Sequence, residues 1–387
     1  MLGQTWGMER TLVLGAGFGG IAVATGLRDR LGDSHFVTLV DRSPLFSMRL
    51  RKLWELVGLG TIAEGSRPRA RLAGGGIEVV LAEIAAIDPA GRAADLSVGR
   101  YEADRLVVAL GAARRPELVP GLVEYGHSIW DVGIIPALRR ELERFERGRI
   151  ALVILGAPYP CPPAPYECVM LLDDHFRDRG IRDDVELTVA TVQPMLLPNA
   201  GRAGSDWLAE RLDERGIAWQ VGVKAERIES SRIVFEDGDL RFDLLLAVPP
   251  HRAPQVVAAS GLVSERGWIE PDPGTFATSY PGVWAVGDCT FVELANGLPL
   301  PKAGAMAAAQ GDKVAAQIAA ELTGGAPPEP FGGRGYCFLE TGLHEAALIE
   351  GEFYADPPAV SVADPTPAYH DEKAAFERDH LARWFGD

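Results

Sequence analysis

The 387-residue sequence has no excess of positive charge and no long apolar run. Its 38 Lys and Arg are outnumbered by 54 Asp and Glu, and the resulting net charge of −16 argues against nucleic acid as a partner, because binding phosphates requires a basic surface. No apolar run approaches the ~20 residues that a membrane span needs. No signal peptide precedes the first strand, so we expect a cytoplasmic protein.

Cysteine is also scarce. The four cysteines are too few for a disulfide framework in a chain of this length, and no CxxC pair is present. We therefore expect no metal site, and each cysteine is either core packing or a redox group. The four are Cys161, Cys168, Cys289 and Cys337.

Hydrophobic residues make up 47% of the chain, enough for two or three domains. Short apolar strands alternate with helices, which predicts an α/β protein with two Rossmann-like, doubly wound domains. We expect the first domain to comprise residues 8–115 and 275–325 and to be interrupted by the second, residues 116–274. A C-terminal segment covers 326–387. Residues 77–87 and 94–101 are expected to be strands of a small antiparallel layer.

A glycine-rich turn, GAGFGG, follows the first strand and opens a helix. Gly15 permits the tight turn, Gly17 lets a pyrophosphate approach the backbone, and Gly20 lets helix and strand pack closely. An acidic residue at the end of the next strand can bind ribose hydroxyls. The alternative is a glycine-rich turn without function. The residues expected at the nucleotide are Gly15, Gly17, Phe18, Gly20, Asp41 and Arg42.

Two later segments fit the same ligand. Residues 104–111 form an apolar strand that ends at Gly111, and residues 278–288 end in Gly287 and Asp288. With these motifs, the chain resembles flavoproteins that have two dinucleotide-binding domains. The resemblance implies that FAD is bound, with Gly111, Gly287 and Asp288 at the cofactor. An Asp that merely caps a turn is the alternative for Asp288.

The second domain has lost its glycines. Its first strand is followed by residues 156–167, GAPYPCPPAPYE, in which only the first glycine survives. Proline lacks the N–H that a phosphate would use. The next strand is followed by Thr191, with no acid for a ribose. These features disfavour NAD(P)H binding, so we expect a different electron donor.

Cys161 lies inside this modified turn, and Cys337 lies in the glycine-flanked segment 332–342. With the LPKAG segment at 300–304, these stretches are similar to sulfide:quinone oxidoreductases and the flavin subunit of flavocytochrome c sulfide dehydrogenase. The resemblance implies a redox pair, Cys161 and Cys337, next to the flavin. It also implies a small sulfur donor, and quinone or a redox protein as acceptor. Glu167 is the candidate proton acceptor, and Lys302 is expected at the pyrimidine end of the flavin.

Each of these residues has a simpler interpretation. The two cysteines could be packing residues, Glu167 a helix cap, and Lys302 half of a surface ion pair. Cys168 and Cys289 are interpreted as packing. Two features depart from the resembled families. No cysteine precedes Cys161, and residues 45–50 contain none that could attach FAD, which is therefore expected to be non-covalent.

The C-terminal tail, residues 368–387, spaces Phe376, Leu381, Trp384 and Phe385 in a helical pattern among charges. Packing on the body or on a second copy in a homodimer is favoured over peripheral contact with a membrane. His370 and His380 are expected to be solvated. Three functions compete: oxidation of sulfide or a small thiol, an NAD(P)H dehydrogenase of the type II class, and a non-catalytic flavin-binding partner.

Overall fold

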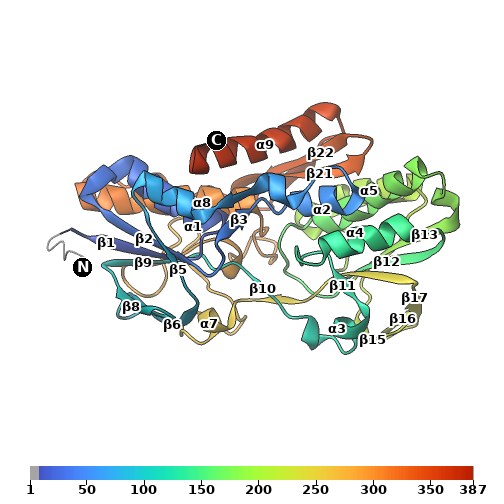
Figure 1. The fold of residues 1–387 in the computed structure, drawn as a ribbon, viewed down its shortest axis with the longest axis horizontal. Coiled ribbons are helices and arrows are strands. Elements are labelled where there is room, and N and C mark those ends of the chain that lie inside the picture. Colours follow the sequence, from blue (N-terminus) through green and yellow to red (C-terminus); the bar gives the residue numbers. More distant parts are fainter. Residues whose placement is uncertain (1–7, 387) are drawn as a thin grey trace.

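Two parallel five-stranded sheets lie at opposite ends of the molecule (Figure 1). The computed structural model describes residues 8–386. The first sheet has the order β20-β9-β1-β2-β5, formed by Val283–Ala285, Arg105–Val108, Arg10–Leu14, Phe36–Asp41 and Glu78–Leu81. The second has the order β11-β18-β12-β13-β14, formed by His127–Ser128, Leu244–Val248, Gly148–Ile154, Val185–Thr191 and Ala218–Gln220. The two parallel sheets match the predicted fold class.

The first sheet is covered on one face by helices α1 (Phe18–Leu31) and α8 (Gly304–Thr323). The two helices pack closely through glycine, because a Cβ atom at Gly311 would lie 2.4 Å from the carbonyl oxygen of Gly19. Their first residues are neighbours, since a Cβ at Gly304 would lie 3.1 Å from the Phe18 ring. Two positive helix ends therefore converge at the carboxyl edge of this sheet.

The second sheet is flanked by helices that bury its apolar strands. Helix α2, from the first half of the chain, packs against α4 and α5 and joins the same core. These helices, with two short ones elsewhere, are α2 (Arg51–Val57), α3 (Leu122–Tyr125), α4 (Ile135–Arg144), α5 (Ala164–Asp178), α6 (Gly201–Glu214) and α7 (Gln255–Ala258).

Small antiparallel sheets lie beside the two main ones. The prediction of one strand over residues 77–87 was wrong, because its first half, β5, pairs with β2 in the parallel sheet. Only its second half joins the antiparallel layer. The small sheets consist of β3 (Leu45–Ser47) with β4 (Ser66–Pro68); β6 (Ile84–Asp88), β7 (Ala93–Leu96) and β8 (Gly99–Glu102); and β15 (Ala225–Glu229), β16 (Arg232–Phe235) and β17 (Asp239–Arg241).

The chain passes between the two halves through paired strands, β10 (Ala113–Arg114) and β19 (His251–Arg252), which run antiparallel. After β19, Val257, Leu262 and Trp268 pack with strands of the first sheet. These contacts favour a return crossover near residue 250, earlier than the expected boundary at 274.

The C-terminal segment forms a meander, β21 (Arg334–Gly342), β22 (Glu345–Glu352) and β23 (Ala359–Val362), followed by helix α9 (Pro367–Phe385). Strand β21 contacts both α5 and α8, and α9 lies across the top of the molecule (Figure 1). The apolar side of α9 packs on the body of the protein, because Leu381, Trp384 and Phe385 are buried in the hydrophobic core formed by the first sheet, α1 and α8. Within residues 8–386, no helix is long and apolar enough to cross a membrane.

The two histidines of α9 are partly buried, whereas the sequence predicted solvated side chains. His370 contacts the buried carboxylate of Glu340 at 3.0 Å, and the His380 ring lies 4.1 Å from that of Phe376 and 4.9 Å from that of Trp384. The sequence prediction assumed that the polar side of this helix faces solvent. In the structure, the meander covers part of that polar side.

Candidate active site

The glycine-rich turn between β1 and α1 has room for a phosphate. Gly15 has a φ of +101°, and a Cβ there would lie 2.4 Å from the carbonyl oxygen of Ala109. A Cβ at Gly20 would lie 1.8 Å from the carbonyl oxygen of Gly15, whereas one at Gly17 would meet nothing within 4 Å. Within residues 8–386, no acceptor binds the first three amides of α1, so they are available to an anion.

The carboxylate of Asp41 is held at the end of β2. It accepts hydrogen bonds from the amides of Ala16 at 2.8 Å and Ser43 at 2.9 Å, which places it beside the glycine-rich turn. Arg42 is exposed and lies 3.9 Å from Glu83. The Phe18 ring packs with Phe46, Phe376 and Trp384 and anchors α9 to the start of α1.

Asp288 borders a small pocket at the start of α8. Its carboxylate makes no hydrogen bond within the described part of the chain, and burial raises its pKa, an effect that Lys302 opposes. The neighbouring amide of Gly287 donates to Gln310 at 2.7 Å. A half-buried carboxylate that is left unpaired beside a helix start suits a ligand that brings hydroxyl donors. Gly111 has a φ of +67°, and a Cβ there would meet nothing within 4 Å.

The ammonium of Lys302 faces away from solvent. It donates to the carbonyl oxygens of Asp288 at 2.9 Å and Thr290, and it lies 4.0 Å from the centre of the Trp268 ring. Burial lowers its pKa to about 8. Lys302 is therefore not the surface ion-pair residue of the simpler interpretation, and it lines the pocket beside Asp288. A contact with the flavin stays a prediction.

Cys161 is held in the turn between β12 and α5. Its amide donates to the carbonyl oxygen of Lys302 at 2.6 Å, which ties the turn to the segment before α8. Its φ of +54° lies in the left-handed region, which costs a residue other than glycine about 1–3 kcal/mol. Cys161 is strained, and it is also held by a hydrogen bond from the other half of the molecule. Together these observations indicate that the turn fixes the position of the Cys161 side chain.

Cys337, on β21, lies beside Cys161 although 175 residues separate them in the chain. The side chains of the two residues lie close enough to interact, and both are free thiols that are partly buried. The neighbouring Cys337 thiol, helped by Lys52 and Lys373, lowers the pKa of Cys161 against the opposing effects of burial and Glu167. The neighbouring Cys161 and burial together raise the pKa of Cys337. The two sulfurs are therefore unequal, and Cys161 is the one that favours the thiolate.

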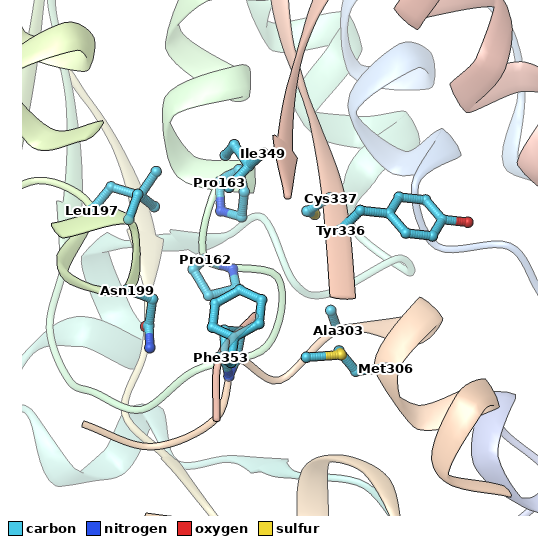
Figure 2. Close-up of a pocket in the computed structure, with 12 residues that line it drawn as sticks. Pro162, Pro163, Leu197, Asn199, Ala303, Met306, Tyr336, Cys337, Ile349 and Phe353 are labelled. Atoms are coloured by element: carbon cyan, nitrogen blue, oxygen red, sulfur yellow. The ribbon is translucent and has the colours of Figure 1, made fainter. Parts of the chain in front are cut away.

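A largely apolar pocket opens beside Cys337 (Figure 2). Asn199 is the main polar group, and its amide already donates to the carbonyl oxygen of Pro299 at 2.9 Å. The Tyr336 ring points away from the other labelled residues, as expected for neighbours on a strand (Figure 2). The pocket is lined by Pro162, Pro163, Leu197, Asn199, Ala200, Pro301, Ala303, Met306, Tyr336, Cys337, Ile349 and Phe353.

Glu167 belongs to a buried ionic cluster. Its Oε1 atom accepts from Lys373 Nζ at 2.5 Å and from the amide of Glu340 at 3.0 Å, so it is no simple helix cap. Lys373 also lies 3.4 Å from Glu340, which His370 and Trp54 contact in turn. Burial opposes the charge on Lys373, but the two carboxylates outweigh it and raise its pKa. Lys373 is therefore a fixed cation near the cysteine pair.

The family model for pyridine nucleotide-disulphide oxidoreductases matches residues 9–311. The chain belongs to this family. It is a flavin-dependent oxidoreductase that binds FAD. The residues present fit this cofactor, because the free amides of α1 and the space at Gly17 suit phosphate groups, and the unpaired carboxylate of Asp288 suits hydroxyl groups.

Relatives of this flavoprotein share most of its length. It is 26% identical to the mitochondrial sulfide:quinone oxidoreductase of Mus musculus over 89% of this chain and 78% of the relative. It is 27% identical to the sulfide-quinone reductase of Aquifex aeolicus, over 90% of this chain and 84% of the relative. The type II NADH:quinone oxidoreductase of Staphylococcus aureus is 22% identical, over 82% and 83%.

The solved structure of the sulfide:quinone oxidoreductase from Aquifex aeolicus has the same fold as this flavoprotein. The TM-score is 0.88 at 23% identity, with 98% of this chain and 92% of that chain covered. The similarity includes the C-terminal meander and α9, which lie beyond the matched family model.

The other two cysteines of this flavoprotein lie in its cores. Cys168, on α5, is 1% exposed, and burial raises its pKa to about 12. The thiol of Cys289 donates to the carbonyl oxygen of Val286 at 3.3 Å, and burial raises its pKa to about 11. A high pKa keeps both thiols protonated and unreactive.

Sequence reasoning missed three charged residues near the cysteine pair: Lys52, Glu340 and Lys373. Lys52 and Lys373 each occur in a helix with many other charges, which predicts a solvated side chain. One signal was present, because Glu340 follows Cys337 on a strand whose remaining residues are largely apolar. Charged residues inside a buried strand indicate a paired or functional group.

Proposed function

We propose that the protein oxidises sulfide, or a related small thiol, through Cys161 and Cys337, and passes the electrons through FAD to quinone or another acceptor. The observation that carries this proposal is the meeting of two thiols, from distant segments, beside an apolar pocket. The names of the mouse and Aquifex relatives support the sulfur donor and the quinone.

The proposed reaction starts from the oxidised pair, a disulfide between Cys161 and Cys337. Hydrosulfide entering from the pocket attacks the sulfur of Cys337, which lines that pocket. An S–S bond forms between the incoming sulfur and Cys337, and the bond between the two cysteines breaks. The electron pair of the broken bond stays on Cys161 as a thiolate, so the step needs no other oxidant.

The unequal pKa values of the two sulfurs support this direction of attack. The better leaving group is the thiol with the lower pKa, and here that is Cys161. A second sulfide or thiol then takes the terminal sulfur from Cys337 as a persulfide and leaves a thiolate there. Bound FAD supplies the two-electron acceptor that allows the two thiolates to form the disulfide again.

In this proposal, Lys373 stabilises negative charge at the site and Glu167 accepts a proton. The Lys373 ammonium, fixed between Glu167 and Glu340, lowers the cost of negative charge on Cys161. When hydrogen sulfide enters in its neutral form, Glu167 is the carboxylate that we expect to accept its proton. The apolar pocket favours that neutral form, because an anion loses its hydration there.

Anaerobic mixing of the oxidised holoenzyme with sulfide tests the proposal. We expect sulfide to bleach the flavin absorbance, and Cys161→Ser to slow bleaching by at least about 100-fold, because removing a group that forms the covalent intermediate removes the step. Cys168→Ser is the matched control, seven residues further along and buried, and it should bleach like the wild type. Bleaching by sulfide at an undiminished rate in Cys161→Ser would falsify the proposal.

A further inference from the structure

Arg69 is a buried arginine that reaches the glycine-rich turn from outside the β1–α1 unit. It begins the short 3-10 helix Arg69–Gly75 and is 7% exposed. Its Nε atom donates to the carbonyl oxygen of Ala16 at 3.1 Å, and its Nη2 atom lies 3.4 Å from Oδ2 of Asp41. A buried charge needs partners, and this guanidinium finds them in the turn and at the end of β2.

The remaining donors of Arg69 hold the chain that follows β2. Its Nη1 atom donates to the carbonyl oxygens of Ser43, at 2.7 Å, and Leu45. Its own amide donates to the carbonyl oxygen of Pro44 at 2.9 Å. A guanidinium has five N–H donors in a fixed planar arrangement, so one side chain can set the relative positions of several acceptors. Arg69 thereby joins the glycine-rich turn, the end of β2 and residues 43–45.

The hydrogen bond from Arg69 to Ala16 sets the direction of the next amide. The C=O of Ala16 and the N–H of Gly17 belong to one trans peptide, so they point in opposite directions. With its carbonyl oxygen on Arg69, this peptide directs the Gly17 amide away from the guanidinium. That amide donates to no acceptor within residues 8–386, and a Cβ at Gly17 would meet nothing within 4 Å. The Gly17 amide is therefore available to a phosphate.

The carboxylate of Asp41 is held by the same arrangement. Its Oδ2 atom accepts from the amide of Ala16 at 2.8 Å and lies beside Arg69, while its Oδ1 atom accepts from the amide of Ser43 at 2.9 Å. A carboxylate has about four lone-pair positions, so Asp41 can still accept a hydroxyl. An acid at the end of the second strand is the group that binds a ribose in dinucleotide sites of this fold.

We propose that Arg69 is a positioning residue for FAD, which holds the Gly17 amide and the Asp41 carboxylate in place for the diphosphate and the adenosine ribose. Arg69 acts through Ala16 and Asp41, whose positions its guanidinium fixes. This inference concerns the binding of the cofactor, so it goes beyond the proposed sulfur chemistry and does not depend on it.

Arg182 provides a matched control in the other half of the molecule. Its Nε atom pairs with the buried carboxylate of Asp173, and its Nη1 atom donates to the carbonyl oxygen of Val185 at 2.6 Å. Its Nη2 atom donates to the carbonyl oxygen of Arg215 at 3.0 Å. Like Arg69, it ties a carboxylate to backbone carbonyls, but it does so at the start of β13 in the second sheet. Its loss should reduce stability without changing the glycine-rich turn.

The test removes FAD from the full-length protein and measures two dissociation constants, that of FAD by quenching of flavin fluorescence and that of ADP by calorimetry. We expect Arg69→Met to weaken both by about 100-fold, because ADP contains the diphosphate and adenosine of FAD. Arg69→Lys keeps the charge but loses the fork of donors, and it should weaken both about tenfold. Arg182→Met should bind FAD and ADP as the wild type does.

Melting temperatures of the FAD-free proteins separate positioning from stability. Arg69→Met and Arg182→Met should both melt below the wild type, since each leaves acceptors without a donor, and only the affinities should distinguish them. Equal losses of FAD affinity in these two variants would reduce Arg69 to a stabilising residue and overturn the inference. An ADP affinity that stays at the wild-type level would also overturn it, because Arg69 would then act outside this turn.

Arg69→Lys decides alone if Arg69→Met does not fold. Wild-type affinity for FAD in Arg69→Lys would then overturn the inference, because the fork of donors would not be needed. Since these measurements use no sulfide, their failure is distinct from a failure of sulfide to bleach the flavin.

Discussion

The chain contains two strand–turn–helix units of the same kind, β1–α1 and β12–α5, and they present different groups to the space beside them. In the first, three residues join strand and helix, and the first amides of the helix are free. In the second, the amide of Ala164 donates to Cys161, and those of Tyr166 and Glu167 both donate to the carbonyl oxygen of Pro163. Pro165 has no amide hydrogen to offer.

The difference shows how one topological position can serve two ligands. The carboxyl end of a central parallel strand is the usual binding place in α/β sheets, and a helix start provides amides there. The first unit leaves those amides for phosphates. In the second unit, the amides are hydrogen-bonded within the turn and the helix. Cys161, whose φ lies in the left-handed region, presents a sulfur atom in their place. On the proposed function, the position that holds a nucleotide in the first unit holds, in the second, a side chain with which the electron donor reacts.

The largest expected effect comes from filling the gap in the first unit. Gly17→Val adds a side chain where a Cβ meets no protein atom, so the fold should remain while the pyrophosphate is displaced. Losing two hydrogen bonds to a charged group costs about 4 kcal/mol, or about 1,000-fold in FAD affinity. The measurement is flavin content after purification and titration of the apoprotein with FAD.

Gly74→Val is the matched control for this prediction. Gly74 is an exposed residue of the short 3-10 helix Arg69–Gly75, where a Cβ also meets nothing within 4 Å, and it is far from the glycine-rich turn in sequence. It should retain FAD at the wild-type level. If Gly17→Val binds FAD as tightly as the control does, then the phosphates do not lie at the start of α1, and the contrast between the two units is lost.

The second unit predicts a poor response to NADH. Without two or more amide contacts to a phosphate, each worth about 1.5–3 kcal/mol, anaerobic bleaching by NADH should be at least about 100-fold slower than bleaching by sulfide. Stopped-flow measurements on one holoenzyme preparation compare the two donors directly. NADH as the faster donor would reverse our assignment, place the protein functionally beside its type II NADH:quinone oxidoreductase relative, and make Cys161 a packing residue.

Local sequence signals predicted the parts of the site that are themselves local. The spacing of Gly15, Gly17 and Gly20 predicted the geometry of the first turn, since Gly15 and Gly20 closely approach atoms of the same strand–turn–helix unit or of the neighbouring strand, and Gly17 faces open space. The two sheets followed from alternating strands and helices. The prolines around Cys161 likewise indicated a helix start with few free amides.

The ionic groups around the cysteine pair could not be predicted in this way. Lys52 and Lys373 are surrounded in sequence by polar and charged neighbours, and their burial arises only when α2, α5, β21 and α9 pack together. The contact between Cys161 and Cys337 joins segments of different sheets, and only the resemblance to known flavoproteins indicated it. Tertiary packing, which no local period encodes, decides which charges become buried.

The smallest effect we expect concerns the backbone of the second unit. The left-handed φ of Cys161 costs Ala about 1–2 kcal/mol, while Gly loses about 0.4–1 kcal/mol more entropy on folding. Cys161→Gly should therefore be more stable than Cys161→Ala by about 0.5 kcal/mol in urea unfolding of the holoenzyme, although neither carries the sulfur. At Cys168, in the middle of α5, the order should be the opposite, because Gly in a helix interior costs about 1 kcal/mol relative to Ala. If Ala were more stable than Gly at both positions, the turn would hold Cys161 without strain. The backbone of this turn, unlike that of the glycine-rich turn, would then not be shaped around a ligand.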